Sequence, residues 1–389
     1  MALNQFLKKI DDLIFLKMKT VKNLYHETQV PEPTISKWIN QGTEISAFYF
    51  YKIVHALEKN KNEQEKLKMG YLQNLKAGSC INTKILFILS YLNRDTVLFT
   101  ELLQHCSKHK YLIVRKYAKA FQFYQRRLQG EDIHEIYLEL KTFQSNINKK
   151  EKDLAILCDL LSIMILLDLG DIKLVPTYRN RIKRNLIKIG GSHLKMIYHF
   201  LFIELHSYYL LRRNQITLFQ RHNQSLQKLK NLDFFPVMKG ALHLKAGESY
   251  LLSNYNMAIY NLEKSLEIFH LYQDESRYKQ ALNDLNFVRI SHWRDIDKID
   301  FKQLHPAEQA LFYIELGQND KAIILLDDLE RKNGKLTALQ ICYKGMATLN
   351  LSLIQQSIQM FQSNNDFFFV QYAQKAYQKV LNQEQTIKS

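Results

Sequence analysis

Residues that form turns are scarce in this chain. It has 12 glycines and 5 prolines among 389 residues, about 4% together, where an average protein carries roughly 12%. An all-β sandwich or barrel needs a turn signal every 8–12 residues or so, and that many are not present. Between the breaks, apolar residues recur with helical spacing. The sequence therefore predicts an all-α protein.

The first 70 residues predict four or five short helices. Apolar residues with helical spacing occur around Phe6–Ile14, Val21–Tyr25 and Phe48–Leu57. Between them Pro31 and Pro33 break the chain and precede Ile35, Trp38 and Ile39 at helical spacing. Residues 1–70 are thus expected to be a separate, compact helical domain.

One string in this domain has a familiar form: TVKNLYHETQVPEPTISKWINQGTEISAFYFYKIVHAL. It resembles the helix-turn-helix of Cro/C1-like phage repressors, whose second helix enters the DNA major groove. By position, the resemblance implies a DNA-binding role for Glu32, Thr34, Ser36, Lys37 and Gln41. Two positions depart from the family pattern: Tyr25 replaces a small residue at the helix crossing, and Gln29 replaces the turn glycine. A helical cap that keeps this fold but no longer binds DNA remains an alternative.

The rest of the chain predicts a helical repeat array over residues 71–365. Amphipathic segments of roughly 12–18 residues alternate with short polar turns, consistent with helix pairs that repeat every 35–40 residues or so. The clearest turn markers are Leu169-Gly170-Asp171, Arg212-Arg213-Asn214, Ser253-Asn254-Tyr255, Leu316-Gly317-Gln318-Asn319 and Leu349-Asn350. Two units, around Gly247 and Gly317, are tetratricopeptide-like.

Residues 366–389 are expected to form a carboxyl-terminal capping helix. One of its faces is apolar and consists of Tyr372, Ala376, Tyr377, Val380 and Leu381. Such a face can pack against a partner subunit, so these residues are candidates for dimerisation.

The formal charge of +16 is concentrated in one part of the chain. Residues 171–240 carry 13 Lys and Arg against 3 Asp and Glu, whereas residues 241–389 carry 16 against 17. Excess positive charge favours polyanions, nucleic acid first. The basic block could be a solubilising surface, a set of phosphate contacts beside the helix-turn-helix, or a surface that receives a peptide carboxylate.

No motif in the sequence predicts an enzyme, a cofactor or a metal site. The chain lacks a G-x-S-x-G motif and a glycine-rich phosphate loop, and the pair His105 and His109 has no third ligand nearby. The four cysteines are widely separated, the amino terminus has no signal-like apolar run, and the most apolar stretch (154–167) contains Asp159. These features predict a cytoplasmic protein without a membrane partner.

A small repressor-like domain followed by a helical array resembles the cytoplasmic peptide-pheromone receptors of Gram-positive bacteria and their phages. The carboxyl half is most similar to the arbitrium (AimR-like) receptors of the lysis–lysogeny decision, through GESYLLSNYNMAIYNLEKSLEIF (247–269), KAIILLDDLERK (321–332) and YKGMATLNLSLIQQSIQMFQSNNDFFF (343–369). The resemblance implies a homodimer in the bacterial host cell that binds double-stranded operator DNA and a short quorum-sensing peptide.

The resemblance also assigns candidate peptide-binding residues. Acidic residues that pair with a peptide arginine in relatives match Glu308 and Asp366 here. Tyr208 replaces the asparagine, and Lys239 is the basic candidate, of the pair that holds the peptide carboxylate. These departures imply a different peptide, or none.

The sequence therefore predicts a peptide-responsive, DNA-binding transcriptional regulator. The alternative is a protein–protein interaction module that sequesters another regulator and has a helix-turn-helix of purely structural role.

Overall fold

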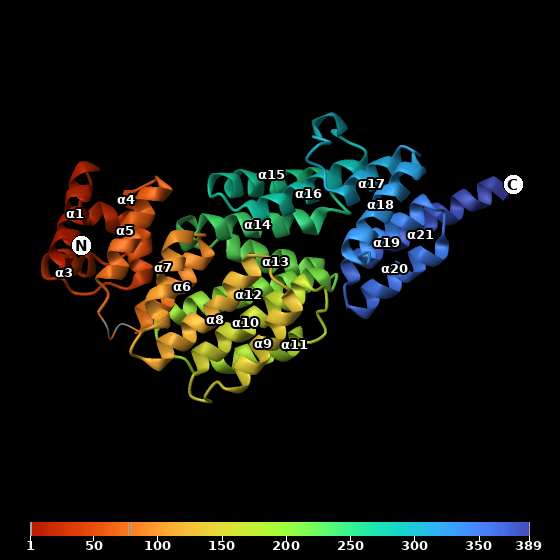
Figure 1. The fold of residues 1–389 in the computed structure, drawn as a ribbon. Coiled ribbons are helices and arrows are strands. Elements are labelled where there is room, and N and C mark those ends of the chain that lie inside the picture. The colour runs from red at the N-terminus through yellow and green to blue at the C-terminus, as the bar shows by residue number, and fades with distance from the viewer. Residues whose placement is uncertain (1, 77, 79, 389) are drawn as a thin grey trace. The chain divides into compact units, whose positions relative to one another are not determined.

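The structure is a computed structural model that describes residues 2–76, 78 and 80–388 (Figure 1). Over these residues every regular element is a helix: twenty-one α-helices and two short 3-10 helices. This confirms the all-α class, and the succession of helix pairs is consistent with an α-solenoid. None of the described helices combines the length and apolar character needed to cross a membrane.

Five short helices occupy the amino-terminal part: α1 (Leu3–Leu16), α2 (Val21–Thr28), α3 (Glu32–Gln41), α4 (Ala47–Leu57) and α5 (Lys61–Gln73). Thr20 begins α2 with a capping box, in which its hydroxyl accepts from Asn23 N and the Asn23 side chain accepts from Thr20 N. The aromatic ring of Phe50 on α4 joins its neighbours, since Trp38 meets it edge-on at 5.7 Å and Tyr71 stacks on it at 4.2 Å. An aromatic cluster therefore lies in an otherwise largely aliphatic interior.

The turn between α2 and α3 keeps a left-handed backbone although it lacks the expected glycine. Gln29 adopts φ 57° and ψ 26°, a conformation that costs a non-glycine residue about 1 kcal/mol. Its side-chain amide donates to His26 O at 3.0 Å and so offsets part of this cost. Tyr25, expected at the helix crossing, is 37% exposed, and Leu24 and Thr28 are buried in its place.

The remaining helices follow the chain in order: α6 (Cys80–Leu92), α7 (Thr96–Ser107), α8 (Leu112–Leu128), α9 (Ile133–Ser145), α10 (Lys152–Asp168), α11 (Val175–Leu186), α12 (Ser192–Arg212), α13 (Ile216–Gln227), η1 (Lys230–Phe234), α14 (Pro236–Tyr250), α15 (Tyr255–Leu271), α16 (Glu275–His292), η2 (Ile296–Lys298), α17 (Pro306–Glu315), α18 (Asn319–Asn333), α19 (Ala338–Ala347), α20 (Leu351–Ser363) and α21 (Phe367–Lys388). All five predicted turn markers lie at the junctions of consecutive helices, which confirms the predicted positions of these turns.

The chain divides into two compact units. Unit 1 comprises Met1–Ser162, Asn180–Leu201 and Lys230–Met238, and unit 2 comprises Ile163–Arg179, Phe202–Leu229 and Lys239–Ser389. In unit 1, a buried ion pair between Lys68 and Asp95 (2.9 Å) connects α5 to the start of α7, and Tyr51 donates to the same carboxylate.

Glycines inside helices of unit 2 allow close helix packing. A Cβ at Gly247 would stand 2.6 Å from Leu262 Cγ, and a Cβ at Gly345 would stand 2.6 Å from Ile354 Cγ1 and 2.9 Å from its backbone nitrogen. The pairs α14/α15 and α19/α20 therefore approach more closely than any side chain would permit.

We expect Gly345→Ala to lower the free energy of unfolding by about 1–3 kcal/mol, because the new methyl group meets backbone as well as side chain. The matched control is Gly190→Ala, where nothing lies within 4 Å of the added Cβ. Thermal unfolding of both variants checks this; equal melting temperatures would contradict it.

Candidate functional site

Charged side chains from several helices of unit 2 lie together in its interior. We define the acidic cluster as Glu248 (α14), Asp284 (α16), Glu308 (α17) and Asp366, the residue that precedes α21, with Arg212 at the end of α12. Tyr208 lies one turn before Arg212 on α12 and interacts with the same carboxylates. Residues up to about 160 positions apart in sequence thus share one site.

Arg212 is the cation that compensates part of this cluster. Its guanidinium lies 2.6 Å from Asp366 Oδ2 and faces the rings of Phe369 and Tyr208 at 4.9 and 5.9 Å. Burial raises the pKa of Asp366, and the charge of Arg212 opposes that rise. Asp366 therefore already has a partner within the chain.

The contact between Arg212 and Asp366 belongs to a wider junction. Arg213 donates to Asn365 Oδ1 at 2.7 Å, and Gln371 donates to Asn214 Oδ1 at 2.8 Å. The turn after α12 is thereby bound to the turn before α21, so early and late helices of unit 2 meet.

A second ion pair lies beside the acidic cluster, and its positive and negative charges neutralise each other. Lys245 Nζ on α14 contacts Glu204 Oε1 on α12 and lies 4.7 Å from the ring centre of Tyr208. Burial, followed by the charge of Glu248, raises the pKa of the Tyr208 hydroxyl well above its ordinary value. Tyr208 is therefore a neutral hydrogen-bonding group between the two sets of charges.

The other three carboxylates are poorly compensated. Burial raises the pKa of Glu248, whose Oε1 accepts from Gln280 Nε2 at 3.0 Å. Burial together with Glu248 and Glu308 raises the pKa of Asp284 well above its ordinary value, and Asp284 Oδ2 has no hydrogen-bond partner within the part of the chain that the structure describes. Glu308 Oε2 lies 3.1 Å from His305 Nδ1 and raises the pKa of that histidine. A buried carboxyl with an unsatisfied oxygen and acidic neighbours, as at Asp284, is more typical of a functional site than of a core built for stability.

Three of the four peptide-binding candidates, Tyr208, Glu308 and Asp366, lie in or beside the acidic cluster. Lys239 lies on α14, nine residues before Glu248, a separation of about 13 Å along the helix axis. Sequence reasoning missed Glu248, Asp284 and Arg212 as site residues. Glu248 is the one acidic residue of α14, a signal that could have identified it. Arg212 has no such signal, because it lies among the other cations of the basic block.

The DNA-binding candidates lie on α3. Its side chains Ile35 and Trp38 are buried, Lys37 and Gln41 are exposed, and Glu32, Thr34 and Ser36 are half-buried. The outward face of α3 thus carries the polar residues that the sequence singled out.

The dimerisation candidates lie on α21, and several are covered by their own chain. Ala376 and Val380 are buried, and Tyr372 packs beside Phe287 (5.3 Å) and Tyr343 (6.1 Å). Tyr377 and Leu381 are half-buried. The apolar face of α21 therefore caps the helices of unit 2.

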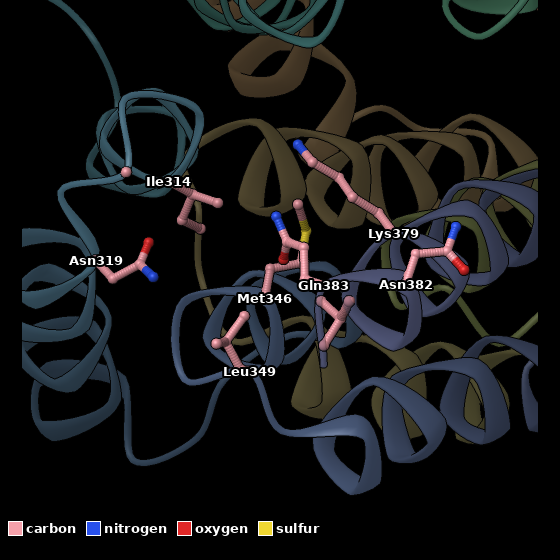
Figure 2. A pocket seen from close by; sticks show the side chains of 9 residues that line it. Ile314, Asn319, Met346, Leu349, Lys379, Asn382 and Gln383 are labelled. Carbon is pink, nitrogen blue, oxygen red and sulfur yellow. The ribbon is translucent and has the colours of Figure 1, made fainter. Parts of the chain in front are cut away.

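A pocket of about 510 Å³ lies beside the same helix (Figure 2). Figure 2 shows Ile314, Met346 and Leu349 on one side and polar side chains of α21 on the other. Lys379 at its edge pairs with Glu315 at 2.8 Å.

Part of the basic block serves internal contacts. Arg181 forms an ion pair with the buried Asp159 in unit 1, and Arg212 and Arg213 hold the junction in unit 2. These three residues do not contribute free positive charge to the surface. No group of three or more His, Cys, Asp or Glu side chains that could hold a metal ion occurs among the residues described.

The fold and this site define a class: an all-α repeat protein with a partly uncompensated acidic cluster shared by distant helices. The chain belongs to the AimR transcriptional regulator-like family, whose model matches residues 64–379. The family is one of transcriptional regulators rather than enzymes. The matched range begins within α5, so α1 to α4 lie outside it.

Individual proteins and solved structures are similar to this chain. An uncharacterized protein of Bacillus anthracis is 26% identical over 230 residues, 58% of this chain and 84% of that protein. The AimR transcriptional regulator of Bacillus phage SPbeta is 29% identical over 177 residues, 44% of each chain. Among solved structures, phAimR-Ligand superposes with a TM-score of 0.68 over 82% of this chain and 93% of that one, and SeMet-phAimR with 0.66 over 97% of both. At 14% identity these two structures show a common fold.

We expect Asp284→Asn to stabilise the protein at neutral pH by on the order of 1–2 kcal/mol, because the amide keeps the shape and removes an uncompensated charge. The folded-state pKa of Asp284 is raised. Its protonated form therefore favours folding at acid pH, and this contribution is lost as the pH rises through the folded pKa. The difference in melting temperature between variant and wild type should be larger at pH 8 than at pH 5.

The control Asp366→Asn should destabilise the protein, because it leaves Arg212 without its carboxylate. A stability gain in Asp284→Asn that does not depend on pH would contradict the account of Asp284.

Proposed function

We propose that this protein is a peptide-responsive, DNA-binding transcriptional regulator of the lysis–lysogeny or quorum-sensing type, acting in the cytoplasm of a bacterial host. The observation that carries the proposal is the acidic cluster, in which Glu248, Asp284 and Glu308 lie together with Arg212 as the nearby cation, itself paired with Asp366. A cationic ligand group would relieve this imbalance, and the relief would supply binding free energy.

The ligand is a short peptide with a guanidinium or ammonium group. That group enters among Glu248, Asp284 and Glu308, while Tyr208 lies beside it. Lys239 is about 13 Å from Glu248 along α14 and receives the peptide carboxylate. An extended chain covers about 3.3 Å per residue, so four or five residues span this distance.

DNA recognition belongs to residues 1–70, with α3 in the major groove. Thr34, Ser36, Lys37 and Glu32 contact base edges, Gln41 lies nearer the backbone, and phosphate contacts supply most of the affinity. Residues 71–365 form the peptide-sensing array. The left-handed turn at Gln29 supports this assignment, because it allows α3 to leave α2 as in a helix-turn-helix.

Regulation requires that the peptide favour one of two conformations. The acidic cluster lies at the junction between the turn after α12 and the turn before α21, so a ligand there acts on the contact that joins early and late helices of unit 2. The regulator is a homodimer, in which α21 and the pocket beside it face the second subunit. Tyr377 and Leu381, with Lys379 and Gln383 at the pocket edge, remain available for this contact, whereas Ala376 and Val380 support it from within.

We expect peptides of four to six residues with one arginine to bind the wild-type protein, and Glu308→Gln to weaken that binding at least tenfold, because it removes one carboxylate from the cationic subsite. Isothermal titration with peptides that contain arginine or citrulline at the same position measures the effect. Glu267→Gln, an exposed acid on α15, is the control and should bind normally. Equal affinity of the arginine and citrulline peptides would refute the cationic subsite.

We expect the double variant Thr34→Ala with Lys37→Ala to lose binding to the operator, because each good base contact contributes about 1–3 kcal/mol of discrimination. Gel shifts of the full chain on DNA from upstream of its own gene measure this, and circular dichroism shows whether folding is retained. Lys8→Ala removes an exposed charge from α1 and is the control. Unchanged binding by the double variant would remove α3 as the recognition helix; no specific shift by the wild type, with or without peptide, would favour the sequestering alternative.

A further inference from the structure

A long part of the basic block contains no acid at all. Between Asp171 and Glu204 the chain has seven Lys and Arg residues and neither Asp nor Glu. Neighbouring carboxylates normally neutralise surface lysines and arginines along a helix. The segment that includes α11 and the start of α12 has no acidic residue of its own to neutralise its positive charge.

The structure sorts these seven residues by role. Arg181 is used internally, in its ion pair with the buried Asp159. We define the basic face as the four exposed residues of this segment that lie in unit 1 and have no ion-pair or hydrogen-bond partner among the residues that the structure describes: Lys183, Arg184, Lys188 and Lys195. Their side chains are free to meet an anionic partner.

The basic face is attached to the amino-terminal domain within the same unit. His193, which lies between Lys188 and Lys195, accepts or donates a hydrogen bond at 2.8 Å between its Nδ1 and Ser46 Oγ. Its ring stacks on Phe48 at 4.9 Å and meets Tyr49 edge-on at 4.4 Å. Since Ser46 directly precedes α4, the segment that carries the basic face is packed against the first turn of that helix.

This attachment brings the part of the segment around His193, which includes Lys195, near the end of α3. Ser46 follows Gln41, the last residue of α3, by five residues, which span at most about 17 Å. One turn of B-DNA is about 34 Å long, and each strand presents a phosphate every 3.4 Å. The separation between the end of α3 and the segment around His193 is therefore shorter than one turn of a bound duplex.

We propose that the basic face is a second duplex-DNA surface, which binds phosphates beside the half-site in α3 without reading sequence. The proposal rests on the proposed DNA binding by α3. It adds DNA phosphates as the partner of the four basic-face side chains, which are not part of α3. Lysine and arginine side chains bind phosphate oxygens regardless of the base, and they release condensed counterions when they do so. The basic face thus lengthens the DNA footprint and increases affinity rather than specificity.

The test compares two quadruple variants that lose the same charge. The first is Lys183→Gln, Arg184→Gln, Lys188→Gln and Lys195→Gln. The control is Lys279→Gln, Lys302→Gln, Lys332→Gln and Lys335→Gln, four exposed lysines of unit 2. Fluorescence anisotropy measures binding of the full chain to a random-sequence 40-base-pair duplex between about 50 and 300 mM salt.

Each phosphate contact contributes about 0.9 to the slope of log K against log salt concentration. We expect the first variant to lower this slope by about 2–4 and to weaken binding more than tenfold at about 100 mM salt, whereas the control keeps the wild-type slope. Equal slopes for the two variants would overturn the proposal. So would preferential loss of binding to single-stranded RNA or to polyglutamate, since either result assigns the face to a different partner.

The experiments distinguish two hypotheses: that the basic face binds DNA, and that α3 is the recognition helix. Thr34→Ala with Lys37→Ala should remove operator specificity but keep most of the salt dependence on random duplex that the basic face supplies. If the quadruple variant loses none of that dependence while the α3 variant loses operator binding, the basic face is excluded and DNA reading by α3 stands.

Discussion

The ion pair between Arg212 and Asp366 is the contact on which the interior of unit 2 depends. It joins the end of α12 to the start of α21 across about 150 residues of sequence, and hydrogen bonds from Arg213 to Asn365 and from Gln371 to Asn214 reinforce it. A repeat array normally makes contacts only between neighbouring repeats. Here α12 and α21, which are far apart in sequence, also meet, and a charged pair lies at their contact.

Electrostatics at this junction bear on stability and on the response to a ligand in the proposed function. Arg212 is the charge partner of Asp366 and also lowers the pKa of Glu248 and Asp284, yet burial raises the pKa of all three carboxyls. Burial therefore penalises the charged forms of these carboxyls, and Arg212 offsets only part of that penalty. A ligand that brought one positive charge would change the energetics of the contact that joins distant helices, and this is the physical basis for coupling between ligand and conformation in the proposed function.

The amino-terminal domain forms a left-handed turn without a glycine. The turn between α2 and α3 retains the left-handed backbone at Gln29, and a side-chain hydrogen bond to His26 supports it. The interior is maintained by Trp38, Phe50 and Tyr71, which pack through their rings. Because His193 packs on the same domain, the basic charge of α11 and α12 is coupled in space to helices that lie far away in sequence.

The sequence by itself determined the helices, their turns and the class of fold, because these follow from the spacing of apolar residues and from caps such as Thr20 and Gly317 within a few residues. It also named Tyr208, Glu308 and Asp366, through a resemblance that covers the carboxyl half. It could not reveal that Asp366 is already paired with Arg212, that Glu248 and Asp284 complete the acidic cluster, or that Arg181 neutralises Asp159 while Lys183 and Lys195 remain free. Those facts depend on which distant helices touch, and burial and pairing of charge are decided only when the tertiary structure brings them together.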